Sequence, residues 1–239
     1  MKQLPASFCV CAAGFALWWC WHKGYLKDVK SDRTPDKPPE RGAIKRVFFI
    51  LTLTMTCSGF VYTGITNTMP KLFESGLGPT FAGSYTEIGV YVGAVIGLSS
   101  ISSLLGGWLA DRYSARSIYI VFWCLTVPPV VLMTSQVGPV LMVVALLAMI
   151  FNTTFAAAEN LLVARYTPFG WRSLAYGAKF VLALGIGGLT VHAAGWVYDQ
   201  RGSFDLLYLF FGGSALLAAA SAVALPRGDS PRESAPAAA

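Results

Sequence analysis

The chain has 239 residues, of which 55% are hydrophobic and only 13% charged, and its mean hydropathy is +0.57. This composition excludes an ordinary soluble domain, a disordered chain and a coiled coil. The net charge of +6 comes from lysines and arginines between apolar segments, so it indicates membrane topology rather than nucleic-acid binding.

Seven apolar segments are each near or above the length of about 17 to 25 residues that a helix needs to cross a bilayer. A helix is expected for each, because lipid offers no partner to the backbone of an open strand and the segments lack the alternation of a barrel strand. The predicted fold is an all-α polytopic membrane protein with seven transmembrane helices, at residues 6–21, 47–69, 85–109, 118–135, 137–158, 174–198 and 206–225.

The first predicted span stands apart from the other six. Its tryptophans are too bulky for a signal-peptide cleavage site, so we expect a retained span that normally follows others, with sequence missing upstream. The predicted parts of the chain are an isolated first span at 1–22, a basic cytoplasmic linker at 23–46, a six-helix bundle at 47–226 and a disordered cytoplasmic tail at 227–239.

Alternate connections carry most of the 18 lysines and arginines. The linker holds eight, whereas the opposite face has only Lys2, Lys71 and Arg201. By the positive-inside rule the basic face is cytoplasmic, which places the amino terminus outside and the carboxyl terminus inside. We therefore expect a multi-pass protein of the cell (inner or plasma) membrane, with the lipid bilayer as one partner and no nucleic acid.

No motif predicts an enzyme, a metal or a cofactor. The five cysteines lie within apolar segments, where buried thiols behave as small hydrophobic groups, and the two histidines, His22 and His192, are isolated. Neither a nucleophile elbow nor a phosphate loop is present in the sequence. The expected set of cofactors is empty, with proton coupling left open.

The third span ends in the sequence GWLADRYSAR, at residues 107–116. It resembles the cytoplasmic loop signature of the major facilitator superfamily, roughly G-x-L-x-D-R-x-G-R-R. Ser114 and Ala115 depart from that pattern. With these departures, the sequence resembles the more degenerate second copy of the signature, which lies between the eighth and ninth of twelve spans. The resemblance implies a carboxyl-terminal half that comprises spans six to twelve and needs either the missing amino-terminal half or a second copy as its partner.

The ends of the third and sixth spans are similar, with GWLADR at 107–112 and GWVYDQR at 195–201. Two sets of three helices would place these ends equivalently and on opposite sides of the membrane, because three is odd. Such an inverted 3+3 repeat is typical of secondary transporters. The resemblance, which this repeat supports, implies secondary active transport of a small solute by alternating access. The alternatives are a non-transporting truncated product or membrane assembly partner, and a seven-helix receptor.

Two groups of residues are candidates for conformational and solute contacts. In the loop signature, Gly107 would allow close helix approach, and a conformational latch or a simple helix cap would use Asp111, Arg112 and Arg116. On the second span, polar groups recur at steps of three and four around Gly59, which favours a substrate path but also fits hydroxyls bonded to their own backbone. The candidate path residues are Thr52, Thr56, Thr63, Asn67 and, on the fifth span, Asn152.

Ionisable groups within spans are costly, so each needs a partner or a function. Glu159 is expected at the inner end of the fifth span, where its candidate partners are Arg165, Arg172 and Lys179. Glu87 suits the dipole at the start of the third span, and His192 lies near the outer end of the sixth. Coupling is the alternative function for these groups. Small faces for helix packing are expected at Gly89, Gly93, Gly97, Gly185 and Gly188.

Overall fold

The computed structural model describes residues 41–78, 84–167 and 172–225. The predicted first span, most of the predicted linker and the whole predicted tail lie outside these residues. Within them, six helices are long and apolar enough to cross a membrane. The described part of the chain is all-helical, as the sequence predicts.

These six helices correspond to the last six predicted spans. Most extend beyond their apolar segments and include polar residues at their ends. The longest, α2, has 36 residues and includes Lys71 and Glu74 in its final turns. The bounds are α2 (Arg41–Gly76), α3 (Tyr85–Arg112), α4 (Ala115–Leu132), α5 (Pro139–Tyr166), α6 (Arg172–Arg201) and α7 (Asp205–Val223).

Local sequence signals set several helix ends. Ser84 caps α3 through a capping box in which Glu87 bonds back to the backbone N–H of Ser84. Ser114 accepts a hydrogen bond from the N–H of Ser117 at the start of α4. Gly138 has a φ of +63°, which favours glycine, and is followed by Pro139 in the first turn of α5.

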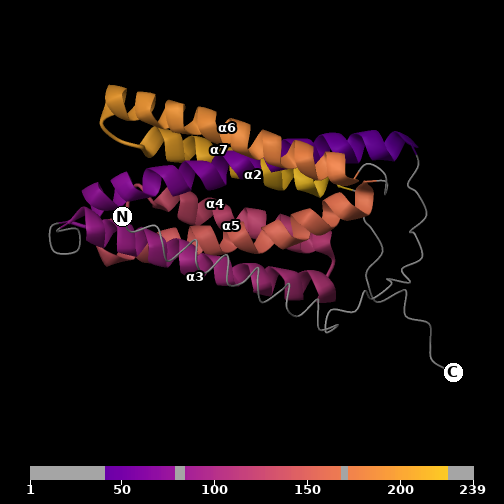
Figure 1. Ribbon diagram of the computed structural model, residues 1–239, viewed down its shortest axis with the longest axis horizontal. Helices are drawn as coiled ribbons and strands as arrows, with labels where there is room; N and C mark the ends of the chain where they lie inside the picture. The colour runs from indigo at the N-terminus through magenta and orange to yellow at the C-terminus, as the bar shows by residue number, and fades with distance from the viewer. Residues whose placement is uncertain (1–40, 79–83, 168–171, 226–239) are drawn as a thin grey trace, which may run out of the picture. The chain divides into compact units, whose positions relative to one another are not determined.

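The helices form two groups of three. Figure 1 shows α2, α6 and α7 in one group and α3, α4 and α5 in the other. Within the groups, α2 packs mainly on α6 and α7, and α5 packs mainly on α3 and α4, while contacts of α4 with α7 and of α2 with α5 join the groups. Each set of three consecutive helices therefore contributes its first helix to the group formed by the last two helices of the other set.

Close backbone approaches hold two of the helix pairs together. A Cβ atom on Gly59 of α2 would lie 2.6 Å from the Cα of Ala183 on α6, and one on Gly187 of α6 would lie 2.8 Å from a methyl carbon of Thr63. On α3, a Cβ atom at Gly106 would overlap the carbonyl oxygen of Thr154 on α5. Small residues let these helices approach to full van der Waals contact.

Aromatic side chains fill the spaces between the other helices. Phe155 of α5 stacks on Trp123 of α4 with ring centroids 4.4 Å apart. Phe60 of α2 meets Phe211 of α7 edge-on at 5.0 Å. The hydroxyl of Tyr208 on α7 lies 2.9 Å from that of Thr68 on α2, which satisfies two buried polar groups at one contact.

The glycine faces expected on α3 and α6 do not form packed contacts within the described residues. No atom lies within 4 Å of an added Cβ at Gly89, Gly93, Gly97, Gly185 or Gly188. Within the bundle the close approaches occur instead on other faces of the same helices, at Gly106 and Gly187. The exposed glycines lie on surfaces that no described helix covers.

Candidate functional site

A buried ion pair joins α5 and α6 at the end of the bundle where α2, α4 and α6 begin, here called the basic end. The Lys179 Nζ lies 2.7 Å from the Glu159 Oε1, with side chains only 12% and 2% exposed. Lys179 also donates a hydrogen bond of 2.6 Å to the Oδ1 of Asn160. Of the three bases that the sequence offered to Glu159, the structure therefore places Lys179 against it. The side chains of Arg165 and Arg172 lie outside the described set.

Two tyrosines extend this ion pair into a cluster. The Tyr119 hydroxyl on α4 donates to the Glu159 Oε2 at 3.3 Å, so both carboxylate oxygens have partners. The Tyr176 hydroxyl on α6 donates to the backbone carbonyl of Asn160 at 2.7 Å. Because α5 and α6 have few other contacts, this cluster is their principal connection. A buried charge in such a cluster depends strongly on its partner.

On the α2 side of the cluster, Thr54 lies close to the Tyr119 hydroxyl. Trp123 of α4 also lies close to this hydroxyl. The Trp123 indole N–H nevertheless has no hydrogen-bond partner among the described atoms. The cluster thus connects four helices, α2, α4, α5 and α6, around one carboxylate.

Beside the cluster lies a small cavity of about 180 Å³, bounded by α2, α5 and α6. One of the candidate path residues, Thr52, lines it. Lys179 lines it too, so the ion pair has one side toward this space. The residues around the cavity are Phe48, Leu51, Thr52, Met55, Val163, Thr167, Ala175, Ala178, Lys179 and Leu182.

The remaining candidate path residues have different environments. Thr63 packs against Gly187 of α6, and the Asn67 side chain donates to the backbone carbonyl of Thr63 at 2.8 Å. Thr56 is half-buried, whereas Asn152 on α5 is 3% exposed, and its Nδ2 has no hydrogen-bond partner among the described atoms. The polar face of α2 therefore serves partly as a packing seam against α6. The structure does not bring these residues together as one site.

The loop-signature residues have contacts that differ from the expected ones. Gly107 has open space around it, and the close approach occurs one residue earlier, at Gly106. The Arg116 side chain donates at 2.6 Å to the carbonyl of Val223, and Arg112 lies over the Trp108 ring at 4.4 Å. No carboxylate within the described ranges bridges to either arginine. The physical reason is that the last turn of α7 has carbonyls without helical partners, which attract Arg116.

Asp111, the acidic residue of the signature, is exposed at the end of α3 and makes no ion pair within the described ranges. At the opposite end of the bundle, Glu87 serves the capping box of α3. His192 is exposed on α6. These groups lie apart from the Glu159 cluster.

Several members of the cluster were missed by sequence reasoning. Tyr119, Tyr176 and Asn160 were not selected, although a tyrosine within an apolar span is itself a signal, because its hydroxyl needs a partner when it is buried. The spacing of Tyr119 and Trp123, four residues apart, also places both on one face of a helix.

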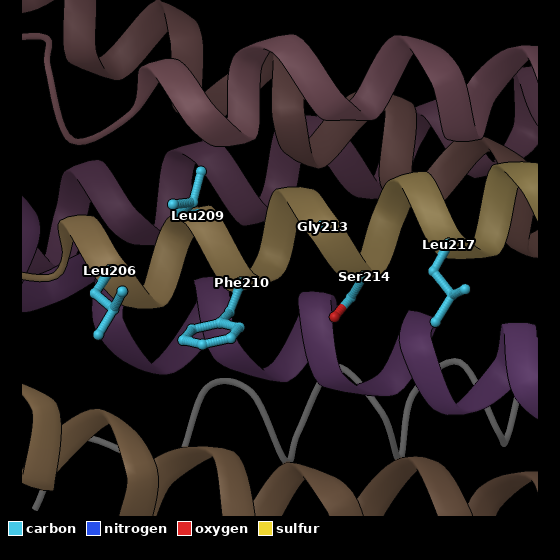
Figure 2. A pocket seen from close by; sticks show the side chains of 6 residues that line it. All are labelled: Leu206, Leu209, Phe210, Gly213, Ser214 and Leu217. Carbon is cyan, nitrogen blue, oxygen red and sulfur yellow. The ribbon is translucent and has the colours of Figure 1, made fainter.

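A second depression, of about 250 Å³, lies on α7, and all its lining residues belong to that helix. Figure 2 shows the side chains of Phe210 and Ser214 on one side of the helix and Leu209 on the other. The lining is apolar apart from Ser214, so it provides no charged group for a polar solute. The Glu159 cluster, which includes Lys179, is therefore the stronger candidate site.

Comparison with known proteins identifies the class of this fold. The profile of the Major Facilitator Superfamily matches residues 51–239, and the chain belongs to this family. It is accordingly a multi-pass membrane protein of a transporter family and not an enzyme. A search of curated proteins gives no match.

Solved structures of the peptide transporter POT have the same fold. The complex with alafosfalin has a TM-score of 0.65 and 17% identity, and the complex with sulfate has a TM-score of 0.62 and 16% identity. Each match covers 74% of this chain and 37% of the POT chain. The chain thus corresponds to well under half of the length of these transporters, and at such identity the likeness concerns the fold alone.

Proposed function

We propose that the chain is the carboxyl-terminal half of a secondary active transporter that moves a small solute by alternating access. The observation that carries the proposal is the exchange of helices between the two groups, in which α2 packs with α6 and α7 while α5 packs with α3 and α4. Together with the family profile, this packing favours a transporter half over a seven-helix receptor.

The same exchange supports an inverted 3+3 repeat. If α2, α3 and α4 correspond to α5, α6 and α7, the contacts of one set are those of the other with the two sets interchanged. Three helices per set make the two copies antiparallel in the membrane. The proposed domain organisation is the predicted one. The first span precedes the basic linker, and this bundle and a cytoplasmic tail follow.

A partner surface is proposed on α3 and α6. These are the least buried of the six helices, with 28% and 24% of their most apolar windows buried. Among the described residues the two helices do not contact each other, and each presents open glycines, with Asp111 at the basic end of α3. We assign the surface to a missing amino-terminal half or a second copy, and a conformational latch would form where Asp111 and Arg112 meet that partner.

The proposed orientation has the basic end in the cytoplasm of a cell whose inner or plasma membrane holds the protein. Arg112, Arg116 and Lys179 all lie toward that end, whereas Lys71 and Arg201 lie at the other. This asymmetry supports an intracellular basic end. Proton coupling is proposed for Glu159, the one buried carboxylate among the described residues.

Alternating access is testable without knowing the solute. Single cysteines replace Thr56 and Asn67 in a chain whose native cysteines are substituted, and membrane-impermeant maleimide is added to inside-out and right-side-out vesicles. We expect labelling of Thr56→Cys from both sides, because a path residue faces each side in turn. Leu216→Cys on the exposed face of α7 is the matched control and should remain unlabelled in lipid. Labelling of Thr56→Cys from one side only would contradict alternating access.

Uptake separates the transporter from its main alternative. Vesicles that contain only this chain are supplied with a panel of isotope-labelled peptides, sugars and carboxylates. Uptake above that of empty vesicles shows that the chain transports when alone or paired with itself. Uptake no faster than in empty vesicles, together with one-sided labelling, would favour a non-transporting product or an assembly partner.

A further inference from the structure

The cavity beside Lys179 combines one cation with an otherwise apolar lining. Of its ten lining residues, seven are apolar, two are threonines and Lys179 is the only charged one. Its volume of about 180 Å³ is about six times the 30 Å³ that a water molecule occupies in the liquid. It is smaller than the roughly 300 Å³ of the smallest typical drug-sized sites. A short molecule with one polar end fits these dimensions.

Lys179 keeps a donor available for such a polar end. An ammonium group has three N–H donors and no acceptor. Glu159 and Asn160 receive two of them, at 2.7 and 2.6 Å. Among the described residues no third acceptor lies within hydrogen-bonding distance of this nitrogen. A ligand acceptor placed in the cavity would complete the set.

We propose that this cavity binds the anionic head of a short amphipathic molecule, a carboxylate or phosphate on a small apolar body, with Lys179 as the group that receives the head. The apolar body lies against Leu51, Met55 and Leu182. This inference rests on the proposed function in so far as it names a substrate class for the transporter. The binding itself requires no transport.

Glu159 sets the strength of this site, because it competes with the ligand for Lys179. Lys179 and Glu159 together carry no net charge, so the unaltered chain binds the anionic head weakly, through the remaining N–H donor of Lys179. The variant Glu159→Gln removes the competing charge but retains a side chain that can accept from Tyr119. Lys179 is then uncompensated, so it should attract an anion more strongly.

Isothermal titration calorimetry of the purified full chain in phosphatidylcholine nanodiscs tests the proposal. Hexanoate is the probe, and hexanamide is its uncharged analogue. We expect Glu159→Gln to bind hexanoate about tenfold more tightly than the unaltered chain, which is the effect of one additional charge-assisted interaction. Hexanamide affinity should change little. Adding Lys179→Gln to Glu159→Gln should abolish hexanoate binding without leaving a buried unpaired charge.

A steric variant separates the cavity from the ion pair. Ala178→Leu fills the cavity while Glu159 and Lys179 remain, so it should lose hexanoate but keep its unfolding temperature. His192→Ala, on the exposed face of α6, should bind like the unaltered chain. Hexanoate affinity that is the same in Glu159→Gln, in the Glu159→Gln and Lys179→Gln double variant and in Ala178→Leu would overturn the proposal.

Nanodiscs that contain phosphatidylglycerol distinguish the two sources of an anionic head. If a lipid headgroup is the natural occupant, anionic lipid should weaken hexanoate binding through Lys179. If the occupant is a free solute anion, the lipid should have no effect. Both results support an anion site. Absence of hexanoate binding to Glu159→Gln in either lipid refutes the site but leaves alternating access, measured by labelling, untouched.

Discussion

The side chain of Lys179 determines whether the buried carboxylate of Glu159 has a cationic partner. Glu159 is buried and Lys179 is its only cationic partner among the described contacts. We expect Lys179→Met to lower the free energy of unfolding by about 3 to 5 kcal/mol, because it leaves a buried charge without compensation. Thermal unfolding of the detergent-purified protein, followed by tryptophan fluorescence, measures the loss.

The double variant Glu159→Gln and Lys179→Met is the decisive companion. It removes both charges, so it should recover most of the stability that Lys179→Met loses. His192→Ala provides the control, since this exposed side chain lacks a described partner. If the double variant is no more stable than Lys179→Met, the ion pair does not stabilise the fold in the way the geometry indicates.

The sequence alone does not show which side chains on different helices contact each other. The sequence placed Glu159 near the inner end of its span and offered three bases, but the choice depends on how α6 turns relative to α5. Lys179 is about two helical turns after the start of α6 at Arg172, with a side chain long enough to return to Glu159. Tyr119 was invisible as a partner because its contact with Glu159 spans 40 positions of the chain.

At the scale of helix pairs, neighbouring glycines on α3 should behave differently. Gly106→Ala places a methyl group against the carbonyl of Thr154, and a backbone atom of α5 cannot move away as a side chain can. We expect a loss of about 1 to 3 kcal/mol, the usual effect of overpacking. The change in unfolding temperature measures it.

Gly107→Ala is the matched substitution one position later. Its methyl group meets open space, and alanine favours a helix by about 0.5 to 1 kcal/mol over glycine. Its stability should be equal to or slightly above that of the unaltered chain. Equal losses in the two variants would mean that α3 and α5 do not meet at Gly106 as described.

Arg116 makes an element-scale contact of a different kind, between the start of α4 and the end of α7. Arg116→Met should loosen the last turn of α7, because the carbonyl of Val223 loses its donor. Hydrogen–deuterium exchange of the amides before Val223 should become faster. Arg112→Met, which removes only the contact with Trp108, should leave that turn unchanged. Equal exchange in both variants would contradict the assigned cap.

Helix positions were predictable because the length of an apolar segment and the polar residues that bound it can be read from the local sequence. The sequence placed all six described helices, with ends that differ by several residues where polar turns extend the helix, most clearly for α2. Helix faces were less predictable. Periodicity places Gly93 and Gly188 on small faces, but only the packing shows that both face open space among the described residues, whereas Gly187 meets α2.

At the scale of the whole molecule, the open faces of α3 and α6 require a covering surface. Glycine-rich helix faces in membranes typically pack against other helices, because there the loss of lipid contacts is offset by close backbone packing. A chain without another half has only its own copies for this purpose, and a twofold pair would bring the same two faces together twice. We therefore expect the chain to dimerise through α3 and α6 when it is expressed alone.

Cysteine cross-linking tests this expectation in native membranes. Gly93→Cys and Gly188→Cys are introduced together in a chain without its native cysteines, and the membranes are oxidised with copper phenanthroline. A band at twice the monomer mass on non-reducing gels is expected, because one copy's α3 would lie against the α6 of the other. Leu216→Cys, on the exposed side of α7, should remain monomeric. If the glycine pair also remains monomeric, the second copy is excluded as the partner, and the surface belongs to a separate amino-terminal half.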